Sequence, residues 1–395
     1  MKYFLRVIPV LLAIVIAGGA FVSPVYSKVV PDAQQLLDSL KEVLAPDSRT
    51  AIFELQAITE GNSTVLEGKV DDREKKDAVA RAFADYNIKY TDKIAVLGEQ
   101  FDKPWALVKL SVASLRTAGK HSAEMATQAI MGTPVKLLEQ EGDWFRAQTP
   151  DKYIAYIPAN SIWQLTSAEF DAWRKSKRYI VTAYQSELTS LFQLLSQNGE
   201  PKGTISDLVQ GNILEFKNDE KGKIRLATPD GREGYIDAAD AQELGEWADQ
   251  PFSAEKIEQT ANRMMGSGYL WGGTSTKMTD CSGLTKICYF ANGIIIERDA
   301  SQQALNGEIF APDQWKNAQL GDLLFFGNAK GRVVHVGIYL FNGEYIHCSG
   351  QVKINSLNPQ APHYLSTPLV SISRVNGKIG THGITAVKKH KWYFE

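Results

Sequence analysis

Apolar positions recur at helical spacing in two segments near the start of the chain, and alternating segments lie between them. Residues 32–44 (DAQQLLDSLKEVL) place leucine and valine on one face, which predicts a helix. TAIFELQAI and TVLEGKV are typical of strands, with TEGNS as their turn. The acidic start of DDREKKDAVARAFADYN and its Ala/Val/Phe spacing predict a second helix. Residues 28–90 are therefore expected to form a small α+β subdomain, for which the sequence indicates no chemistry.

Two regions of short alternating segments follow, each broken by frequent turns. In residues 91–166, WALVKLSVASLR, TPVKLLEQEGDWFRAQTPD and KYIAYIPANSIWQL show strand, turn and strand in quick succession. Residues 167–250 contain a more diverged copy around GNILEFKNDEKGKIRLATPDGREGYID. The section EGDWFRAQTPDKYIAYIP resembles the bacterial SH3-like module, a small β-barrel found on many cell-wall enzymes. We therefore expect two such barrels in tandem.

The pattern becomes helical at about residue 251. Ser253 is a suitable N-cap for the helix that follows, and GLTKICYFANG predicts another helix. The strand-like runs VVHVGIYL and EYIHCSG come later, joined by FNGE as a hairpin turn. Because the strands follow the helices, residues 251–395 are expected to form an α+β domain.

The first 27 residues differ from the rest of the chain. Lys2 and Arg6 precede the apolar run VIPVLLAIVIAGGAFV, and VYS offers small residues for cleavage, a pattern typical of a signal peptide. Residues 1–27 are therefore predicted to be a signal peptide, with an uncleaved N-terminal anchor as the alternative. In both cases the folded part is expected to be exported, periplasmic or secreted. After cleavage no stable membrane span is expected.

Composition narrows the function classes. The 395 residues are 44% hydrophobic and 22% charged, as in ordinary globular proteins, and a formal net charge of -2 does not support a nucleic-acid partner. Three cysteines, all in the last third of the chain, leave at least one thiol unpaired. No CxxC pair or Cys/His quartet occurs, so neither a metal nor an organic cofactor is expected. We expect a monomer.

The stretch TDCSGL places Cys281 at the start of a predicted helix. A helix N-terminus favours an anion, so the pKa of this thiol is expected to be lowered. A thiolate needs a general base, and the base needs an orienting group. His335 and His347 fall on adjacent antiparallel strands, where His347 could hold His335 in the useful tautomer. The alternative is a buried structural Cys281, the role expected for Cys288 and Cys348, but the glycine-rich GSGYLWGGTSTKMTD before Cys281 favours an accessible thiol.

Together, YLWGG, TDCSGL, RDASQQ, LGDLLFFG, VVHVGIYL and EYIHCSG resemble the NlpC family of cell-wall cysteine peptidases. The resemblance covers residues 251–395 and implies a papain-like core. It also implies Cys281 as nucleophile, His335 as base and His347 as the third, polar member of the site. The implied activity is hydrolysis of peptidoglycan stem peptides.

The domain order is similar to that of γ-D-glutamyl-L-diamino acid endopeptidases of the dipeptidyl-peptidase VI type. These enzymes cut L-Ala-γ-D-Glu–diamino acid peptides after D-Glu and require a free L-Ala amine. The resemblance implies Glu124, in HSAEMATQAIMGTPV, as an acid near that amine, with Tyr153 or else Tyr156 as the tyrosine. The group often has Ser where this chain has Ala300, a departure that leaves one hydrogen bond to substrate open. The further substrate-binding positions that the resemblance implies are Tyr269, Trp271, Asp280, Ser282, Asp299 and Ser301.

A carboxylate pair of Glu124 and Asp299 would select an ammonium group, because a substrate without the amine would leave both acids unpaired. Each residue also has a structural interpretation: Glu124 as a solvated charge, Asp299 as an N-cap and Trp271 as core packing. Two other functions stay open, an amidase or acyltransferase with the same papain-like site, and a non-enzymatic cell-wall binding protein. The sequence does not distinguish diaminopimelate from lysine in the substrate.

Overall fold

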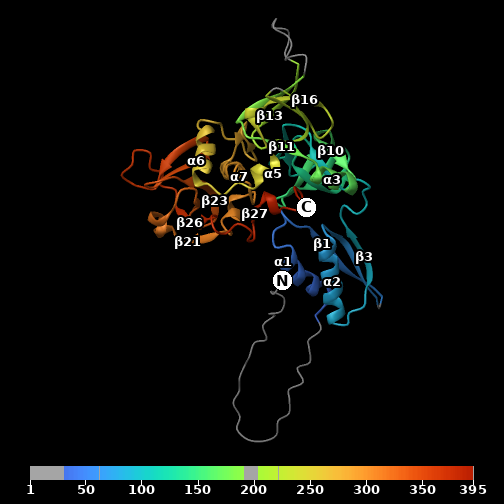
Figure 1. The fold of residues 1–395 in the computed structure, drawn as a ribbon. Coiled ribbons are helices and arrows are strands. Elements are labelled where there is room, and N and C mark those ends of the chain that lie inside the picture. Colours follow the sequence, from blue (N-terminus) through green and yellow to red (C-terminus); the bar gives the residue numbers. More distant parts are fainter. Residues whose placement is uncertain (1–30, 62, 191–202, 221, 395) are drawn as a thin grey trace, which may run out of the picture.

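The structure, a computed structural model, describes residues 31–61, 63–190, 203–220 and 222–394. The signal peptide predicted for residues 1–27 lies outside this part. Within it, no helix combines the length and the apolar character that a membrane crossing requires. Figure 1 shows the N-terminal unit in blue next to the first barrel, and the C-terminal unit in orange and red on the other side of the barrels.

The N-terminal unit is a three-stranded sheet covered by two helices. β1 and β2 form an antiparallel hairpin, whereas β3 adds to β2 in parallel, just beyond the predicted limit at residue 90. Asp72 caps the second helix by accepting the backbone N–H of Lys75 at 2.8 Å. The elements are α1 (Ala33–Leu44), β1 (Phe53–Glu60), β2 (Ser63–Val70), α2 (Arg73–Asp85) and β3 (Thr91–Val96).

Two seven-stranded sheets follow, and they are built in the same way. The order β10-β4-β7-β8-β9-β5-β6 of the first matches the order β17-β11-β14-β15-β16-β12-β13 of the second, strand for strand in sequence order. The first comprises β4 (Trp105–Val108), β5 (Val112–Arg116), β6 (Met125–Ile130), β7 (Pro134–Glu141), β8 (Trp144–Gln148), β9 (Ile154–Pro158) and β10 (Ile162–Leu165). The second comprises β11 (Arg178–Val181), β12 (Gln185–Thr189), β13 (Thr204–Val209), β14 (Ile213–Glu220), β15 (Lys223–Ala227), β16 (Glu233–Asp237) and β17 (Ala241–Glu243), with α3 (Ser167–Lys175) before it and α5 (Leu244–Ala248) after it.

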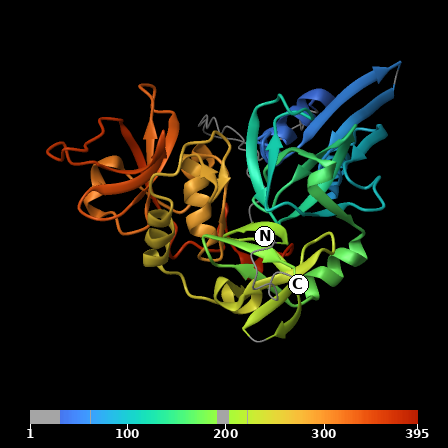
Figure 2. The ribbon, with the colours of Figure 1, turned by 90° about the horizontal axis from the view of Figure 1, so that it is seen from above.

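The C-terminal unit packs helices against a six-stranded sheet of order β21-β26-β22-β23-β24-β25. Its helices lie between this sheet and the barrels (Figure 2). Helices precede most strands in the sequence, which confirms the predicted α+β class. The elements are α6 (Ala254–Arg263), β18 (Thr274–Ser275), β19 (Met278–Thr279), α7 (Cys281–Phe290), β20 (Ile294–Ile296), α8 (Ala300–Gln303), β21 (Glu308–Phe310), β22 (Leu323–Gly327), β23 (Val333–Tyr339), β24 (Glu344–Ser349), β25 (Gln351–Ser356), β26 (Leu369–Arg374) and β27 (Ile384–Ala386).

One apolar cluster joins both barrels to the C-terminal unit. Trp173 precedes the second barrel, and Leu107 belongs to the first, while Val387 and Tyr393 come from the last residues of the chain, and all are buried together. The guanidinium of Arg178 donates to the backbone carbonyl of Tyr393 at 2.8 Å, which ties the chain end to β11. The two barrels and the C-terminal unit thus share one apolar core.

Candidate active site

Cys281 is the first residue of α7, and the residue before it fixes the start of this helix. Asp280 is the N-cap, and its carboxylate accepts the backbone N–H of Gly283 at 2.7 Å. The same carboxylate accepts the backbone N–H of Gly272 at 2.9 Å, which holds the glycine-rich approach against the helix. The position of Cys281 is therefore fixed by two features of the local sequence: the Asp280 N-cap of α7 and the glycine turn at Gly272 that bonds to the same carboxylate.

Arg298 is buried beneath this helix start, with 1% of its surface exposed. Its guanidinium contacts the Asp280 carboxylate at 2.6 Å and the Ser282 hydroxyl at 2.8 Å. Its Nε donates to the Thr127 hydroxyl of β6 at 2.9 Å, so it links the first barrel to the site. Asp280 and Ser282, expected from the resemblance to line the substrate site, are themselves buried and bonded to this arginine. Sequence reasoning missed Arg298, although it stands in the RDASQQ motif.

The hairpin that leads into Cys281 is held by both barrels. Gln128 of β6 accepts the backbone N–H of Thr274 at 2.9 Å. Tyr184, between β11 and β12, donates its hydroxyl to the Thr276 carbonyl at 2.8 Å, and the Thr276 hydroxyl donates to the Tyr184 carbonyl at 3.0 Å. The short β18–β19 hairpin is therefore fixed on both sides.

Cys281 is 8% exposed, and the backbone N–H groups of Val336 and Ser282 donate to its sulfur. Burial, followed by the negative charge of Asp280, raises the pKa of Cys281 to about 11. The predicted lowering of this pKa is therefore wrong. The helix start does supply donors, but the loss of solvent and the N-cap carboxylate outweigh them. The thiol is protonated at neutral pH and needs a base to react.

Two histidines on paired strands, His335 and His347, begin a chain of hydrogen bonds. The first of these strands, β23, also contacts Cys281 through the backbone N–H of Val336. The Nε2 of His335 on β23 lies 2.6 Å from the Nδ1 of His347 on β24. The Nε2 of His347 lies 2.8 Å from the side-chain oxygen of Asn355 on β25. The amide nitrogen of Asn355 in turn donates to the backbone carbonyl of His363 at 2.6 Å. Sequence reasoning missed Asn355, which the strand next to β24 supplies.

This chain of bonds sets the tautomers of both imidazoles. Because the Asn355 oxygen is an acceptor, the Nε2 of His347 carries a proton and its Nδ1 accepts one from His335. The proton of neutral His335 is therefore on Nε2, which leaves the Nδ1 lone pair available as a base. Burial, followed by the positive charge that His347 and Lys353 can carry, lowers the pKa of His335 to about 4. The imidazole is neutral at pH 7.

Glycine is required opposite these rings. A Cβ added at Gly337 would lie 3.2 Å from the His347 Cβ and 2.8 Å from the ring of Tyr345. Because Gly337 has no side chain, His347 and Tyr345 can pack closely against β23, where His347 bonds to His335. The alternation of side chains along the strand VVHVGIYL places His335 and Gly337 on this same face.

The remaining substrate positions named by the resemblance differ in their surroundings. Burial, and then the charge of the neighbouring Cys281, raises the pKa of Tyr269, so this phenol stays protonated next to the sulfur. Trp271 is 61% exposed, which is incompatible with the alternative of core packing. Glu124 is exposed and immediately precedes β6, whose Met125 carbonyl closely approaches Gly272. Glu124 thus lies on the segment that faces the glycine-rich approach.

Asp299 lies at the start of α8 and bonds to residues from two other units. Its carboxylate accepts the Tyr153 hydroxyl at 3.2 Å, whereas Tyr156 donates to Glu141 at 2.8 Å. Of the two tyrosines considered, the structure therefore brings Tyr153 to Asp299. The partner that contacts Asp299 most closely is Arg49, at 2.7 Å, from the segment between α1 and β1. Glu124, expected to act with Asp299 around an amine, makes neither a hydrogen bond nor an ion pair with Asp299, whose described side-chain partners are Arg49 and Tyr153.

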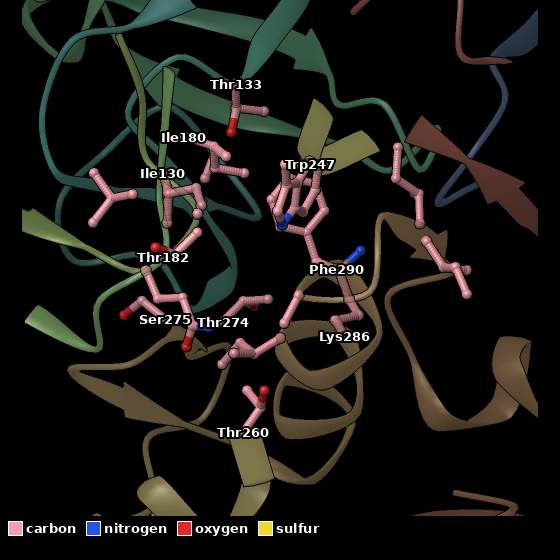
Figure 3. A pocket seen from close by; sticks show the side chains of 18 of the residues that line it. Ile130, Thr133, Ile180, Thr182, Trp247, Thr260, Thr274, Ser275, Lys286 and Phe290 are labelled. Atoms are coloured by element: carbon pink, nitrogen blue, oxygen red, sulfur yellow. The ribbon is translucent and has the colours of Figure 1, made fainter. Parts of the chain in front are cut away.

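A separate cavity of about 470 Å³ lies among the barrels, α6 and α7. Figure 3 shows Trp247, Phe290 and Lys286 along it, and the last two belong to the C-terminal half of α7. Cys281 is at the opposite end of this helix, so the cavity is distinct from the cysteine site. Among the described residues, no group of three or more His, Cys, Asp or Glu side chains is arranged to hold a metal ion.

The neutral thiol makes a pH dependence testable. We expect alkylation of Cys281 by iodoacetamide, followed by mass spectrometry of its peptide, to be slow at pH 7 and to accelerate as pH rises through 9 toward 11. The reason is that only the thiolate reacts and burial delays its formation. Cys288, whose pKa burial also raises, provides the inert control. A rate that is already constant from pH 6 upward would instead indicate a resting thiolate–imidazolium pair.

Comparison with known proteins shows which families this chain resembles. A family model described as NlpC/P60 family matches residues 266–373, and one described as bacterial dipeptidyl-peptidase Sh3 domain matches residues 115–162. Dipeptidyl-peptidase 6 of Lysinibacillus sphaericus is 29% identical over 289 residues, which cover 68% of this chain and 98% of that protein. A γ-D-glutamyl-L-lysine dipeptidyl-peptidase of Bacillus subtilis is 30% identical over 236 residues, which cover 56% of this chain and 71% of that protein.

A crystal structure of an NlpC/P60 family protein from Bacillus cereus has the same fold, with a TM-score of 0.58 and 23% identity over 68% of this chain and 99% of that one. Neither family model extends to residues before 115, so the N-terminal unit lies outside both. The buried Cys281 at the start of α7, the paired histidine strands, the first barrel and these relatives lead to one conclusion. The chain belongs to the NlpC/P60 family of peptidoglycan hydrolases.

Proposed function

We propose that this protein is a cysteine peptidase that hydrolyses the γ-D-glutamyl–diamino acid bond of peptidoglycan stem peptides with a free N-terminal L-Ala. Its role would be cell-wall turnover or recycling. The observation that carries the proposal is Cys281 at the start of α7, next to the strand of His335, whose imidazole continues into His347 and Asn355. The name of the Bacillus subtilis relative, a γ-D-glutamyl-L-lysine dipeptidyl-peptidase, supports the choice of bond.

In the proposed first step, the Nδ1 of His335 accepts the thiol proton as the Cys281 sulfur attacks the γ-carbonyl carbon of D-Glu. Proton transfer accompanies bond formation, because burial disfavours both the Cys281 thiolate and the protonated His335 imidazolium before substrate binds. The negative oxygen of the tetrahedral intermediate is held by the backbone N–H of Cys281 and the hydroxyl of Tyr269. The carbon–nitrogen bond then breaks, and His335 returns its proton to the departing amine of the diamino acid.

In the second step, His335 takes a proton from a water molecule that attacks the thioester. The carbon–sulfur bond breaks, the sulfur recovers a proton, and the L-Ala-D-Glu dipeptide leaves with a free γ-carboxylate. One water is consumed for each bond that is cut. His347 keeps its Nδ1 toward His335 throughout, because Asn355 holds the opposite nitrogen as a donor.

The residues around the cysteine are assigned to two proposed tasks. Tyr269, Trp271, Tyr153, Asp299, Ser301 and Glu124 form the walls of the substrate site, with the acids and Tyr153 at the end that takes the L-Ala amine. Asp280 and Ser282 hold the helix start through Arg298. We also propose that the protein acts as a monomer outside the cytoplasm, in the periplasm or secreted.

Product analysis tests this function. Incubation with L-Ala-γ-D-Glu-diaminopimelate is expected to give L-Ala-D-Glu and free diaminopimelate by mass spectrometry, and the lysine-containing peptide is assayed beside it. The N-acetylated peptide is expected to react more slowly, because its amine has lost the charge that an acid can bind. Release of products from intact sacculi with no cleavage of either free peptide would instead favour the amidase or acyltransferase.

A further inference from the structure

The segment 47–50, between α1 and β1, crosses from the N-terminal unit to both neighbouring units. The backbone carbonyl of Arg49 accepts the N–H of Ile154 on β9 at 2.7 Å, and the carbonyl of Thr50 accepts the amide of Gln148 on β8 at 3.1 Å. The Asp47 carboxylate accepts the side-chain amide of Gln302 on α8 at 2.8 Å. The segment is therefore fixed against the first barrel and against the helix that begins at Asp299.

The guanidinium of Arg49 is held along one edge and donates from the other. Its Nε and Nη2 bond to the Asp47 carboxylate at 2.9 and 2.7 Å, a two-pronged arrangement that fixes the plane of the group. Its Nη1 donates to Asp299 at 2.7 Å and to the Ser301 hydroxyl at 3.1 Å. Tyr153 reaches the same oxygen of Asp299. One nitrogen of Arg49 thus occupies the carboxylate to which the proposed function assigns the substrate amine.

The position is open to a ligand, because the side chains of Arg49 and Asp299 remain 39% and 28% exposed. A substrate ammonium and the Nη1 of Arg49 are both cationic donors that need the same acceptor. The formal charges of Asp47, Arg49 and Asp299 sum to −1, whereas the two acids without Arg49 would carry −2. Arg49 therefore weakens the attraction of this site for an ammonium and occupies its contact point.

We infer that Arg49 is a specificity-determining residue that competes with the N-terminal ammonium of the substrate for Asp299. The inference rests on the proposed function and adds a residue from a unit that both family models leave unmatched. Arg49 limits how strongly the site prefers a free N-terminus over an acylated one. Its neutral replacement increases that preference by improving the binding of free-amine peptides alone.

Kinetics of the full-length mature protein test this role. Arg49→Gln is expected to lower KM for L-Ala-γ-D-Glu-diaminopimelate about tenfold, with kcat nearly unchanged and with little change for the N-acetylated peptide. Arg49→Lys keeps the positive charge but not the two-pronged bond to Asp47, so its KM is expected to lie between those of the wild type and Arg49→Gln. Arg146→Gln is the matched control, because Arg146 also links the first barrel to the N-terminal unit, through Glu54, but does not contact Asp299. It is expected to leave the ratio of the two peptides unchanged.

A binding measurement reads the competition without turnover. The dipeptide L-Ala-γ-D-Glu and its N-acetylated form are titrated by calorimetry into Cys281→Ala and into Cys281→Ala/Arg49→Gln. Tighter binding of the free-amine dipeptide alone supports the inference. An equal change for both dipeptides, or weaker binding of the free-amine form, overturns it and assigns Arg49 to docking or to direct substrate contact. Absence of hydrolysis by the wild type counts against the proposed function, while the ratio of Kd values still decides the role of Arg49.

Discussion

Replacement of Cys281 by alanine is expected to reduce kcat/KM for the free-amine tripeptide by about four orders of magnitude or more. The sulfur is the atom that forms the bond to substrate in the proposed mechanism, and no neighbouring group can replace it. The side chain is small and packs in the C-terminal core, so folding should persist. The measurement is initial-rate kinetics together with urea unfolding of the same preparation.

Cys288→Ala is the matched control for this variant. Cys288 is completely buried, two turns further along α7, and loses the same atom in the substitution. It is expected to keep its activity at a small cost in stability. Turnover in Cys281→Ala, or an equal loss of activity in both variants, would be incompatible with the proposed nucleophile.

Replacement of Arg298 by methionine is expected to lower the free energy of unfolding by about 3–5 kcal/mol. The guanidinium is almost fully buried, and its removal leaves the Asp280 carboxylate without its cationic partner in a region closed to water. The hydroxyls of Ser282 and Thr127 lose their donor as well. Since Asp280 also caps α7, the activity should fall with the stability. Urea unfolding monitored by tryptophan fluorescence measures the change.

Arg225→Met provides the comparison, because Arg225 pairs with Glu233 at 2.7 Å on the surface, where both side chains are more than a third exposed. An exposed pair of this kind contributes about 1 kcal/mol or less. Arg298→Lys keeps the charge without the planar two-pronged geometry and should lie between the wild type and the methionine variant. A methionine variant as stable as Arg225→Met would show that Asp280 does not depend on Arg298.

Local patterns predicted much of the fold. The helix predicted over residues 32–44 corresponds to α1, and the turn FNGE joins β23 and β24 as an antiparallel hairpin. Cys281 is the first residue of a helix because Asp280 has the chemistry of an N-cap, which the sequence displays directly. These features depend on neighbours within a few residues, and such interactions are encoded in spacing and residue type.

Features that depend on distant contacts were not predictable in this way. Arg49 and Asp299 are 250 positions apart, and nothing in the pattern around either residue indicates the other. Asn355 becomes the partner of His347 only through the order of strands in the sheet. The pKa of Cys281 follows from burial, a property of the assembled protein, which is why reasoning from the helix start alone gave the wrong direction.

The β18–β19 hairpin before Cys281 limits how this protein can be divided in engineering experiments. Gln128 and Tyr184 bond to this hairpin from two different barrels, so its conformation depends on contacts outside the C-terminal unit. Excision of this unit for expression by itself would leave the entrance to the nucleophile without its external supports. Domain-swapped chimeras should therefore exchange the barrels and the hairpin as one piece.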